Sequence, residues 1–150
     1  DLVPKFALGY SAIYLGIGAA ALDWTTSYAK KRKLKPDNVP IASYPQIQRL
    51  LGQMNISHES AKLMVQKAAW ILEKFNTEEA FLAINEAKYA ASKASASITE
   101  KALQVLGGPG LFKGYPIERF HRDARAGLLM PPNSDRALIS IAEFYLKGIK

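Results

Sequence analysis

The spacing of apolar residues predicts helices along nearly the whole chain. In the first segment an apolar side chain recurs every three or four residues, at Tyr10, Ile13, Ile17, Ala21, Trp24 and Tyr28. This pattern predicts one long helix that ends near Lys33. The prolines and small polar residues of 35–43 predict a loop after it.

A second helix is expected to begin near Tyr44, with Ser43 as a candidate N-cap and Pro45 in the first turn. The pattern fades at Phe75 and Asn76, where we expect the helix to end. Its apolar stripe consists of Ile47, Leu51, Met54, His58, Ala61, Val65, Ala68 and Leu72.

A third helix is expected to begin at Thr77-Glu78-Glu79, because acidic residues favour the positive end of a helix. Residues 90–97 are almost all alanine and serine, which allows a close approach of another helix. Gly107-Gly108-Pro109 predicts a clean stop. The apolar stripe of this helix consists of Phe81, Ile84, Ala87, Ala91, Ala94, Ile98, Ala102 and Val105.

Two further helices are expected in the last third of the chain. Residues 116–125 predict a short helix with two i,i+4 ion pairs, Glu118/Arg122 and Arg119/Asp123. After Pro131-Pro132, either Asn133 or Ser134 can cap a last helix. The apolar stripe of this last helix is Leu138, Ile141, Tyr145 and Ile149.

These elements predict an all-α fold, an up-down-up-down four-helix bundle, in one domain that spans residues 1–150. No segment shows the alternation of a β-strand. Apolar residues make up 49% and charged residues 22% of the 150 residues, the balance of a globular domain. The chain opens on Asp1-Leu-Val-Pro4 without an initiator methionine, so we expect a carboxy-terminal fragment of a larger protein.

Charge and composition narrow the classes of function. The chain has no cysteine, which excludes disulfides and thiolate chemistry and fits a reducing compartment. The net charge of +7 includes a basic cluster at 30–33 and Lys35, which could attract phosphate groups. No recognition-helix motif or aromatic platform accompanies the basic residues, so we expect no nucleic acid partner. The uncharged run 6–22 is shorter than the roughly 20 residues of a membrane span, and we expect a buried helix instead.

The usual catalytic and metal-binding motifs are missing from the sequence. The two histidines, His58 and His121, are far apart in the chain, and we expect no metal site. His58 lies on an apolar stripe, which favours a hydrogen-bonded core or interface histidine. No Gly-x-Ser-x-Gly motif is present. Gly107-Gly-Pro-Gly110 follows a helix rather than a strand, so it lacks the context of a phosphate-binding loop and, taken alone, indicates a helix stop.

The order of several motifs is more specific than any one of them. Lys30-Lys-Arg32 closes the first helix, and Tyr44-Pro-Gln-Ile-Gln-Arg-Leu-Leu51 opens the second. Gln104-Val-Leu-Gly-Gly108 ends the third helix, and Tyr115-Pro-Ile-Glu-Arg-Phe-His-Arg-Asp-Ala-Arg125 follows. Across essentially the whole chain, this order resembles the carboxy-terminal helical domain of the acyl-CoA dehydrogenase family.

The resemblance implies a role in binding FAD. A complete subunit of that family also has a helical amino-terminal domain and a small β-domain, and the subunits form dimers or tetramers. By resemblance, Arg32 reaches the FAD pyrophosphate of a neighbouring subunit, and an arginine suits that role because guanidinium binds phosphate well. Gln104, Gly107 and Gly108 match positions that touch the adenosine half of that FAD. Asn133 falls where related proteins contact flavin.

Other matched positions concern structure and the last helix. Arg122 and Asp123 match a mostly structural pair of the family. Asp135 falls, like Asn133, near the start of the last helix, whose amino-terminal end favours anions. The carboxylate of Asp135 itself does not suit an anion-binding role.

The chain departs from the family pattern at the catalytic position. The glutamate that removes a proton from the substrate aligns with Pro131, and the alternative position of that base, on the first helix, aligns with about Phe6. Neither residue accepts a proton, and loss of a general base costs roughly 10²- to 10⁴-fold in rate. Asp135 is a weak substitute, because one helical turn moves it about 6 Å along the axis. We therefore expect no catalytic residue in this domain.

Smaller departures lie around the second helix. The family's Phe-Gly after the basic cluster is replaced by Lys33-Leu34, and the Phe-Gln that opens the second helix is replaced by Tyr44-Pro45.

Several functions stay open for the larger protein. One is an acyl-CoA dehydrogenase or related oxidoreductase with an unusual base, which acts on an acyl-CoA or another small organic substrate. A second is a flavin monooxygenase on the same scaffold, and a third is a non-catalytic helical scaffold. The expected setting is a homo-oligomer in the cytoplasm, or in the mitochondrial matrix if the source is eukaryotic. The electron acceptor stays open.

Overall fold

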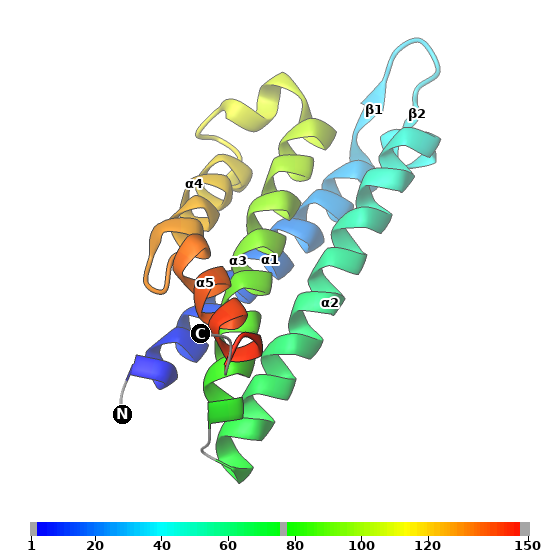
Figure 1. Ribbon diagram of the computed structural model, residues 1–150. Helices are drawn as coiled ribbons and strands as arrows, with labels where there is room; N and C mark the ends of the chain where they lie inside the picture. The colour runs from blue at the N-terminus through cyan, green and yellow to red at the C-terminus, as the bar shows by residue number, and fades with distance from the viewer. Residues whose placement is uncertain (1–2, 76–77, 148–150) are drawn as a thin grey trace.

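The computed structural model describes residues 3–75 and 78–147 (Figure 1). Three long helices lie side by side, and two shorter helices pack on α3, on its side away from α2. The α-helices are α1 (Val3–Lys31), α2 (Pro45–Lys74), α3 (Glu78–Leu106), α4 (Pro116–Leu129) and α5 (Ser134–Tyr145). Two 3₁₀ turns, η1 (Ile41–Ser43) and η2 (Gly108–Leu111), and two short strands, β1 (Lys33–Leu34) and β2 (Val39–Pro40), complete the described elements. The all-α bundle is confirmed, with α4 and α5 sharing the place of a fourth helix.

The central element is α3, which contacts every other α-helix. Alanine and serine make up most of its buried face, which lets the backbones of α1 and α2 approach closely. Every residue of its predicted stripe except Phe81 is buried, and the stripe of α2 is buried or half-buried throughout. Periodicity therefore located the core faces of these two helices correctly.

The predicted face of α1 is partly wrong. Ile13 is 57% exposed, and the neighbouring Tyr14 is buried in its place. The buried face of α1 consists of Ala7, Ser11, Tyr14, Ala21, Thr25 and Ala29. The small residues of this face match the alanine- and serine-rich surface of α3, which leaves little space for larger side chains.

The segment between α1 and α2 is more regular than the predicted loop. β1 and β2 form an antiparallel hairpin in which Lys33 pairs with Pro40 and Leu34 with Val39. The prediction of no strand is therefore wrong at this one place. Ser43 is not the N-cap of α2, because it belongs to η1; Tyr44 occupies the N-cap without a side-chain hydrogen bond. Pro45 stands at the first helical position, as predicted.

The last third of the chain differs from its prediction in three details. α4 extends four residues beyond Arg125, to Leu129. The Glu118/Arg122 pair forms at 3.3 Å. Asp123 instead lies 3.8 Å from Arg122 Nε, and among the described residues it forms no ion pair with Arg119. On α5 the buried residue is Ala137, whereas the predicted core residues Leu138 and Tyr145 are 44% and 67% exposed. Asn76, Thr77 and Ile149, which the sequence analysis used, lie outside the described residues.

Helix α1 is long and apolar enough, from Lys5 to Lys31, to cross a membrane by length and composition alone. The core helix of a bundle meets the same criteria. Here one side of α1 packs on α3 and is buried, while Phe6 and Ile13 are exposed.

Shortening Ile98 is expected to destabilise the bundle modestly. Ile98 is 1% exposed between α3 and its neighbours, so Ile98→Val removes one buried methyl group and costs about 0.5–1.5 kcal/mol. For a domain of this size, that corresponds to a fall in Tm of about 1–6 °C. Ile56→Val is the matched control, because Ile56 is 67% exposed on α2. Equal melting temperatures for the two variants would contradict the packing described here.

Candidate functional site

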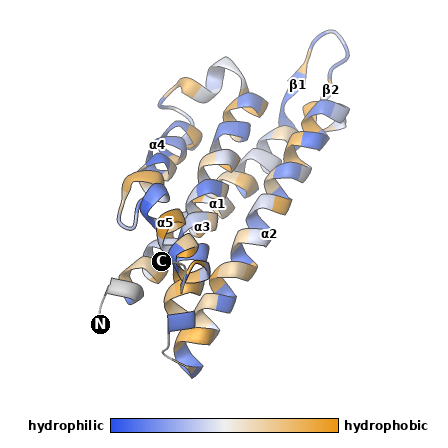
Figure 2. Ribbon diagram, in the orientation of Figure 1, coloured by the Kyte–Doolittle hydropathy of each residue, from blue (hydrophilic) through white to orange (hydrophobic). Residues whose placement is uncertain are grey.

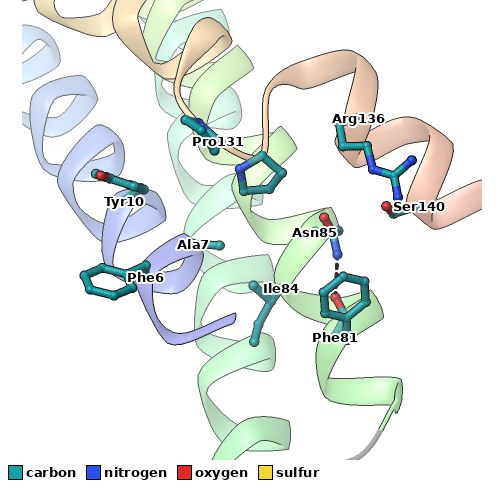
Figure 3. Close-up of a pocket in the computed structure, with 10 residues that line it drawn as sticks. Phe6, Ala7, Tyr10, Phe81, Ile84, Asn85, Pro131, Arg136 and Ser140 are labelled. Carbon is teal, nitrogen blue, oxygen red and sulfur yellow. Dashed lines mark hydrogen bonds between the residues drawn. The ribbon is translucent and has the colours of Figure 1, made fainter. Parts of the chain in front are cut away.

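A cavity of about 520 Å³ lies between the start of α1, the start of α3 and the segment that joins α4 to α5 (Figure 3). Phe6 and Tyr10 come from α1, and Pro131 comes from the joining segment (Figure 3). The remaining lining residues are Ala7, Phe81, Ile84, Asn85, Pro132, Arg136 and Ser140. Three separate stretches of sequence therefore build one cavity.

The cavity is aromatic and apolar, with polar groups on the α3 and α5 side. The Asn85 side chain donates to the Phe81 carbonyl at 2.9 Å, so one of its donors is already used. Arg136 supplies the one positive charge among the lining residues, and no Asp or Glu is among them in the described chain. Both positions at which the sequence analysis sought a base, Pro131 and Phe6, line the cavity, and neither can accept a proton. Among the residues that the structure describes, none therefore contributes a carboxylate to the cavity wall.

The start of α5 holds Asn133 and Asp135. Asn133 is the N-cap of α5, and its Oδ1 accepts a hydrogen bond from the Arg136 backbone N–H at 2.8 Å. This confirms Asn133 rather than Ser134 as the cap. Asp135 is exposed in the first turn of α5 and does not line the cavity.

A second, more open groove of about 620 Å³ lies at the end of α3. Gln104, Gly107 and Gly108 all line it, so the structure brings these three predicted residues together. Its other lining residues are Glu100, Leu103, Leu111, His121 and Arg125. The groove therefore mixes apolar and polar groups, and Glu100 and Arg125 give it charges of both signs.

Glycine is required at the end of α3. Gly107 has φ +68°, a left-handed conformation that ends the helix and that side chains disfavour. A Cβ at Gly107 or Gly108 would meet no atom within 4 Å, so their bare backbone faces open space. A ligand can therefore approach the peptide groups there without obstruction.

Arg32 does not line that groove; it stands between the end of α1 and β1, and β1 lies at the same end of the bundle as the end of α3 (Figure 1). Its backbone N–H donates to the Tyr28 carbonyl at 2.8 Å, and its own carbonyl accepts from Ile41 at 2.8 Å. The backbone is thus held between α1 and η1, while the side chain is exposed. Lys30 and Lys31 occupy the last turn of α1, where cations favour the negative helix end. The result is a fixed, solvent-facing cluster of positive charge.

The two histidines play different roles. The side chain of His58 is 13% exposed, as its stripe position predicted, but its buried Nδ1 has no hydrogen-bond partner in the described chain. The hydrogen bond expected of a core histidine is thus not formed at Nδ1, while Nε2 lies 4.0 Å from Glu59 Oε1. His121 Nδ1 lies 3.3 Å from Thr99 Oγ1, beside the second groove. Among the described residues, no group of three or more His, Asp or Glu could hold a metal ion.

One residue near the cavity escaped the sequence analysis. Lys88 on α3 is only 1% exposed, and its Nζ donates to the carbonyls of Gly127, Met130 and Pro132 at 2.7, 3.2 and 3.1 Å. Its ammonium lies 5.5 Å from the centre of the Tyr14 ring. The sequence could have indicated its burial, since Lys88 follows Ile84 by four residues and so lies one helical turn further along the apolar stripe.

Burial lowers the pKa of Lys88 from its ordinary 10.5 to about 8. Between these values the unfolded chain binds more protons than the folded chain, so the contribution of Lys88 to stability rises with pH there. The free energy of unfolding of the native protein, relative to that of Lys88→Met, is expected to increase between pH 8 and pH 10. Chemical denaturation of both proteins at several pH values measures it. A difference independent of pH would contradict the low pKa. Burial also raises the pKa of the facing Tyr14 above its ordinary 10.0, which favours the neutral form of its hydroxyl group.

Known proteins resemble this chain over nearly its whole length. The model of the family described as "Acyl-CoA dehydrogenase, C-terminal domain" matches residues 6–146. The 3-(aryl)acrylate reductase of Clostridium sporogenes is 38% identical over 140 residues, which cover 93% of this chain and 36% of that protein. The mitochondrial short-chain specific acyl-CoA dehydrogenase of Bos taurus is 36% identical over 145 residues, or 95% of this chain and 34% of that enzyme.

A solved structure has the same architecture. The butyryl-CoA dehydrogenase of Megasphaera elsdenii matches with a TM-score of 0.88 and 27% identity, covering 97% of this chain and 37% of that one. The chain thus spans about a third of the length of each of these relatives.

Proposed function

Because the chain belongs to the acyl-CoA dehydrogenase family, as its C-terminal helical domain, we propose that it completes the cofactor site of an FAD-dependent oxidoreductase. The domain would act as part of a longer subunit, since its relatives are about three times as long. The observation that carries the proposal is that two surfaces lie at one end of the bundle. One is the positive cluster of Lys30, Lys31 and Arg32, and the other is the second groove, lined by Gln104, Gly107 and Gly108.

The residues at that end fit an FAD dinucleotide. A pyrophosphate needs a fixed cation, and the backbone of Arg32 is held at both its N–H and its carbonyl. An adenosine needs bare backbone and an amide side chain, which Gly107, Gly108 and Gln104 offer in one groove. Arg32 does not line this groove, so an extended ligand would run from one to the other. Bound FAD would supply hydride acceptance, which no side chain provides.

The cavity beside the start of α5 would face the flavin and the substrate. Asn133 lies at the start of α5, next to the cavity wall at Pro131 and Pro132. We therefore place the flavin ring of the subunit's own FAD near Asn133, and the pyrophosphate and adenosine of a neighbouring subunit's FAD near Arg32 and Gly107. This arrangement requires a homo-oligomer, either a dimer or a tetramer.

Exposed apolar residues support subunit contacts. Ile56, Leu63 and Trp70 are 67%, 65% and 55% exposed on α2 and recur every seven residues, which places them on nearly one face. Figure 2 shows hydrophobic and hydrophilic stretches in turn along this helix. An apolar stripe of this length favours burial against another surface.

The cavity suits the acyl part of a small organic substrate, such as an acyl-CoA. Its aromatic lining would bury an apolar chain or ring and exclude water from it. The names of the two relatives span an arylacrylate and a short acyl chain, so the size of the substrate is left open. For localisation we propose the cytoplasm, or the mitochondrial matrix in a eukaryote, as in the Bos taurus relative.

Pro131 favours a second candidate function. A dehydrogenase must remove an α-proton, and none of the described residues that line this cavity is a carboxylate. The proton acceptor would then come from another domain, or the reaction would need none, as in a flavin monooxygenase on the same scaffold. A scaffold that has lost its chemistry is the third alternative.

The visible spectrum of the full-length protein distinguishes these functions. We expect bound flavin that an acyl-CoA bleaches slowly under anaerobic conditions, because Pro131 cannot accept the α-proton. Flavin that only NAD(P)H or a reductase reduces, followed by oxygenation of a substrate, would instead support the monooxygenase. No flavin absorbance after incubation with FAD would contradict the proposal and leave the scaffold.

A further inference from the structure

The end of α4 lacks its ordinary hydrogen-bond donors. The last carbonyls of a helix have no partners within the helix, and the backbone N–H groups just beyond the C-cap usually satisfy them. In α4 the C-cap is Met130, so these N–H groups would belong to residues 131 and 132. Both residues are proline and have no N–H. The carbonyl of Gly127, which either residue would have capped, therefore needs a donor from elsewhere.

Lys88 supplies that donor from α3. Its shortest hydrogen bond, at 2.7 Å, goes to the Gly127 carbonyl. The other two go to Met130 and Pro132, at 3.2 and 3.1 Å. An ammonium group has three protons, so its hydrogen-bonding capacity is fully used. Since Lys88 is 1% exposed, solvent cannot easily replace any of these bonds.

The packing around Lys88 fixes the place of the ammonium. A Cβ on Gly127 would lie 3.0 Å from the Tyr14 ring, which is closer than carbon atoms normally approach. Glycine therefore lets α4 lie directly against α1 at this point. The Tyr14 ring, 5.5 Å from Lys88 Nζ, closes the remaining side of the ammonium by a cation–π contact.

We propose that Lys88 is the positioning residue of the segment 130–133. This segment forms the Pro131 and Pro132 wall of the cavity, and it ends at Asn133, the cap of α5. Lys88 does not line the cavity, so it acts on bound molecules only through the segment. The effect of Lys88 on bound molecules rests on the proposed function, whereas the anchoring of segment 130–133 by Lys88 does not.

Hydrogen exchange on the full-length protein tests the anchoring. In Lys88→Met, which keeps the length of the side chain but no donor, we expect the amides of residues 128–130 and 133–137 to exchange at least tenfold faster. Amides in the middle of α1 and α2 should keep their rates. Ser92→Ala is the matched control, since Ser92 is one turn further along α3 and also 1% exposed. No acceleration in Lys88→Met, or one spread evenly over the bundle, would overturn the proposal.

A ligand measurement tests the link to the site. In the full-length protein, Lys88→Met should weaken FAD or acyl-CoA binding at least fivefold, and Lys88→Arg, which keeps donors, should recover part of it. Unchanged binding of both ligands, despite faster local exchange, would limit Lys88 to a structural role and overturn the positioning claim. If the native protein binds no flavin, the proposed function fails, and the exchange experiment still decides the anchoring.

Lys88→Arg also covers the case in which Lys88→Met does not fold. The guanidinium keeps its donors but is bulkier, so we expect faster exchange confined to the same two stretches. Exchange in Lys88→Arg that is faster throughout the bundle would count against the proposal.

Discussion

Placing glutamate at position 131 of the full-length protein is expected to create α-proton exchange that the native protein performs poorly. Pro131 lines the cavity, so Pro131→Glu puts a carboxylate on its wall. A positioned general base contributes roughly 10²- to 10⁴-fold, and we expect a gain of at least about 10²-fold. Incorporation of deuterium from D₂O into the α-carbon of butyryl-CoA measures it.

Pro131→Gln is the control for this variant. It restores the same backbone N–H and nearly the same side-chain size, but it cannot accept the proton. Equal exchange in the glutamate and glutamine variants would show that position 131 does not face the reacting carbon, and the match to the family's catalytic position would be lost.

Replacing Arg32 by alanine is expected to weaken FAD binding by the full-length protein about 10- to 100-fold. A hydrogen bond to a charged group contributes about 1.5–3 kcal/mol, and 1.4 kcal/mol corresponds to a factor of ten. The helical content should not change, because the Arg32 side chain is exposed and its backbone bonds remain. Flavin fluorescence titration gives the affinity and circular dichroism gives the helicity.

Lys33→Ala provides the comparison for Arg32→Ala. Lys33 is the next residue, is also exposed, and carries the same charge. A general effect of positive charge would weaken FAD binding equally in both variants, whereas a specific phosphate contact predicts a clear loss only for Arg32→Ala. Unchanged affinity in Arg32→Ala would remove the phosphate assignment.

Periodicity predicted the core where a helix has one apolar and one polar face. On α2 the charged residues leave only one possible buried stripe, and Met54, Ala61 and Ala68 are indeed buried. On α1 nearly every residue from 6 to 22 is uncharged, so the pattern could not select a face. The choice of Tyr14 over Ile13 follows from the fit against α3, whose core residues Ile84 to Ala91 are 70 to 77 positions away in the sequence.

In the candidate site too, features set by neighbouring residues could be predicted, whereas contacts between residues far apart in the sequence could not. The stop at Gly107 and the cap at Asn133 depend on neighbouring residues and could be predicted. The role of Lys88 depends on carbonyls 39 to 44 residues away, and only the folded chain brings them together. A lysine on an apolar stripe, combined with two prolines after a helix, is a sequence signal for such a contact.

The crystal structure of the full-length protein with FAD tests the central claim most directly. The account predicts an FAD pyrophosphate within hydrogen-bonding distance of the Arg32 guanidinium, with the adenosine in the groove of Gly107 and Gly108. Both contacts would be made to the FAD of a neighbouring subunit. An intact oligomer whose FAD lies far from Arg32 and from both glycines would contradict it.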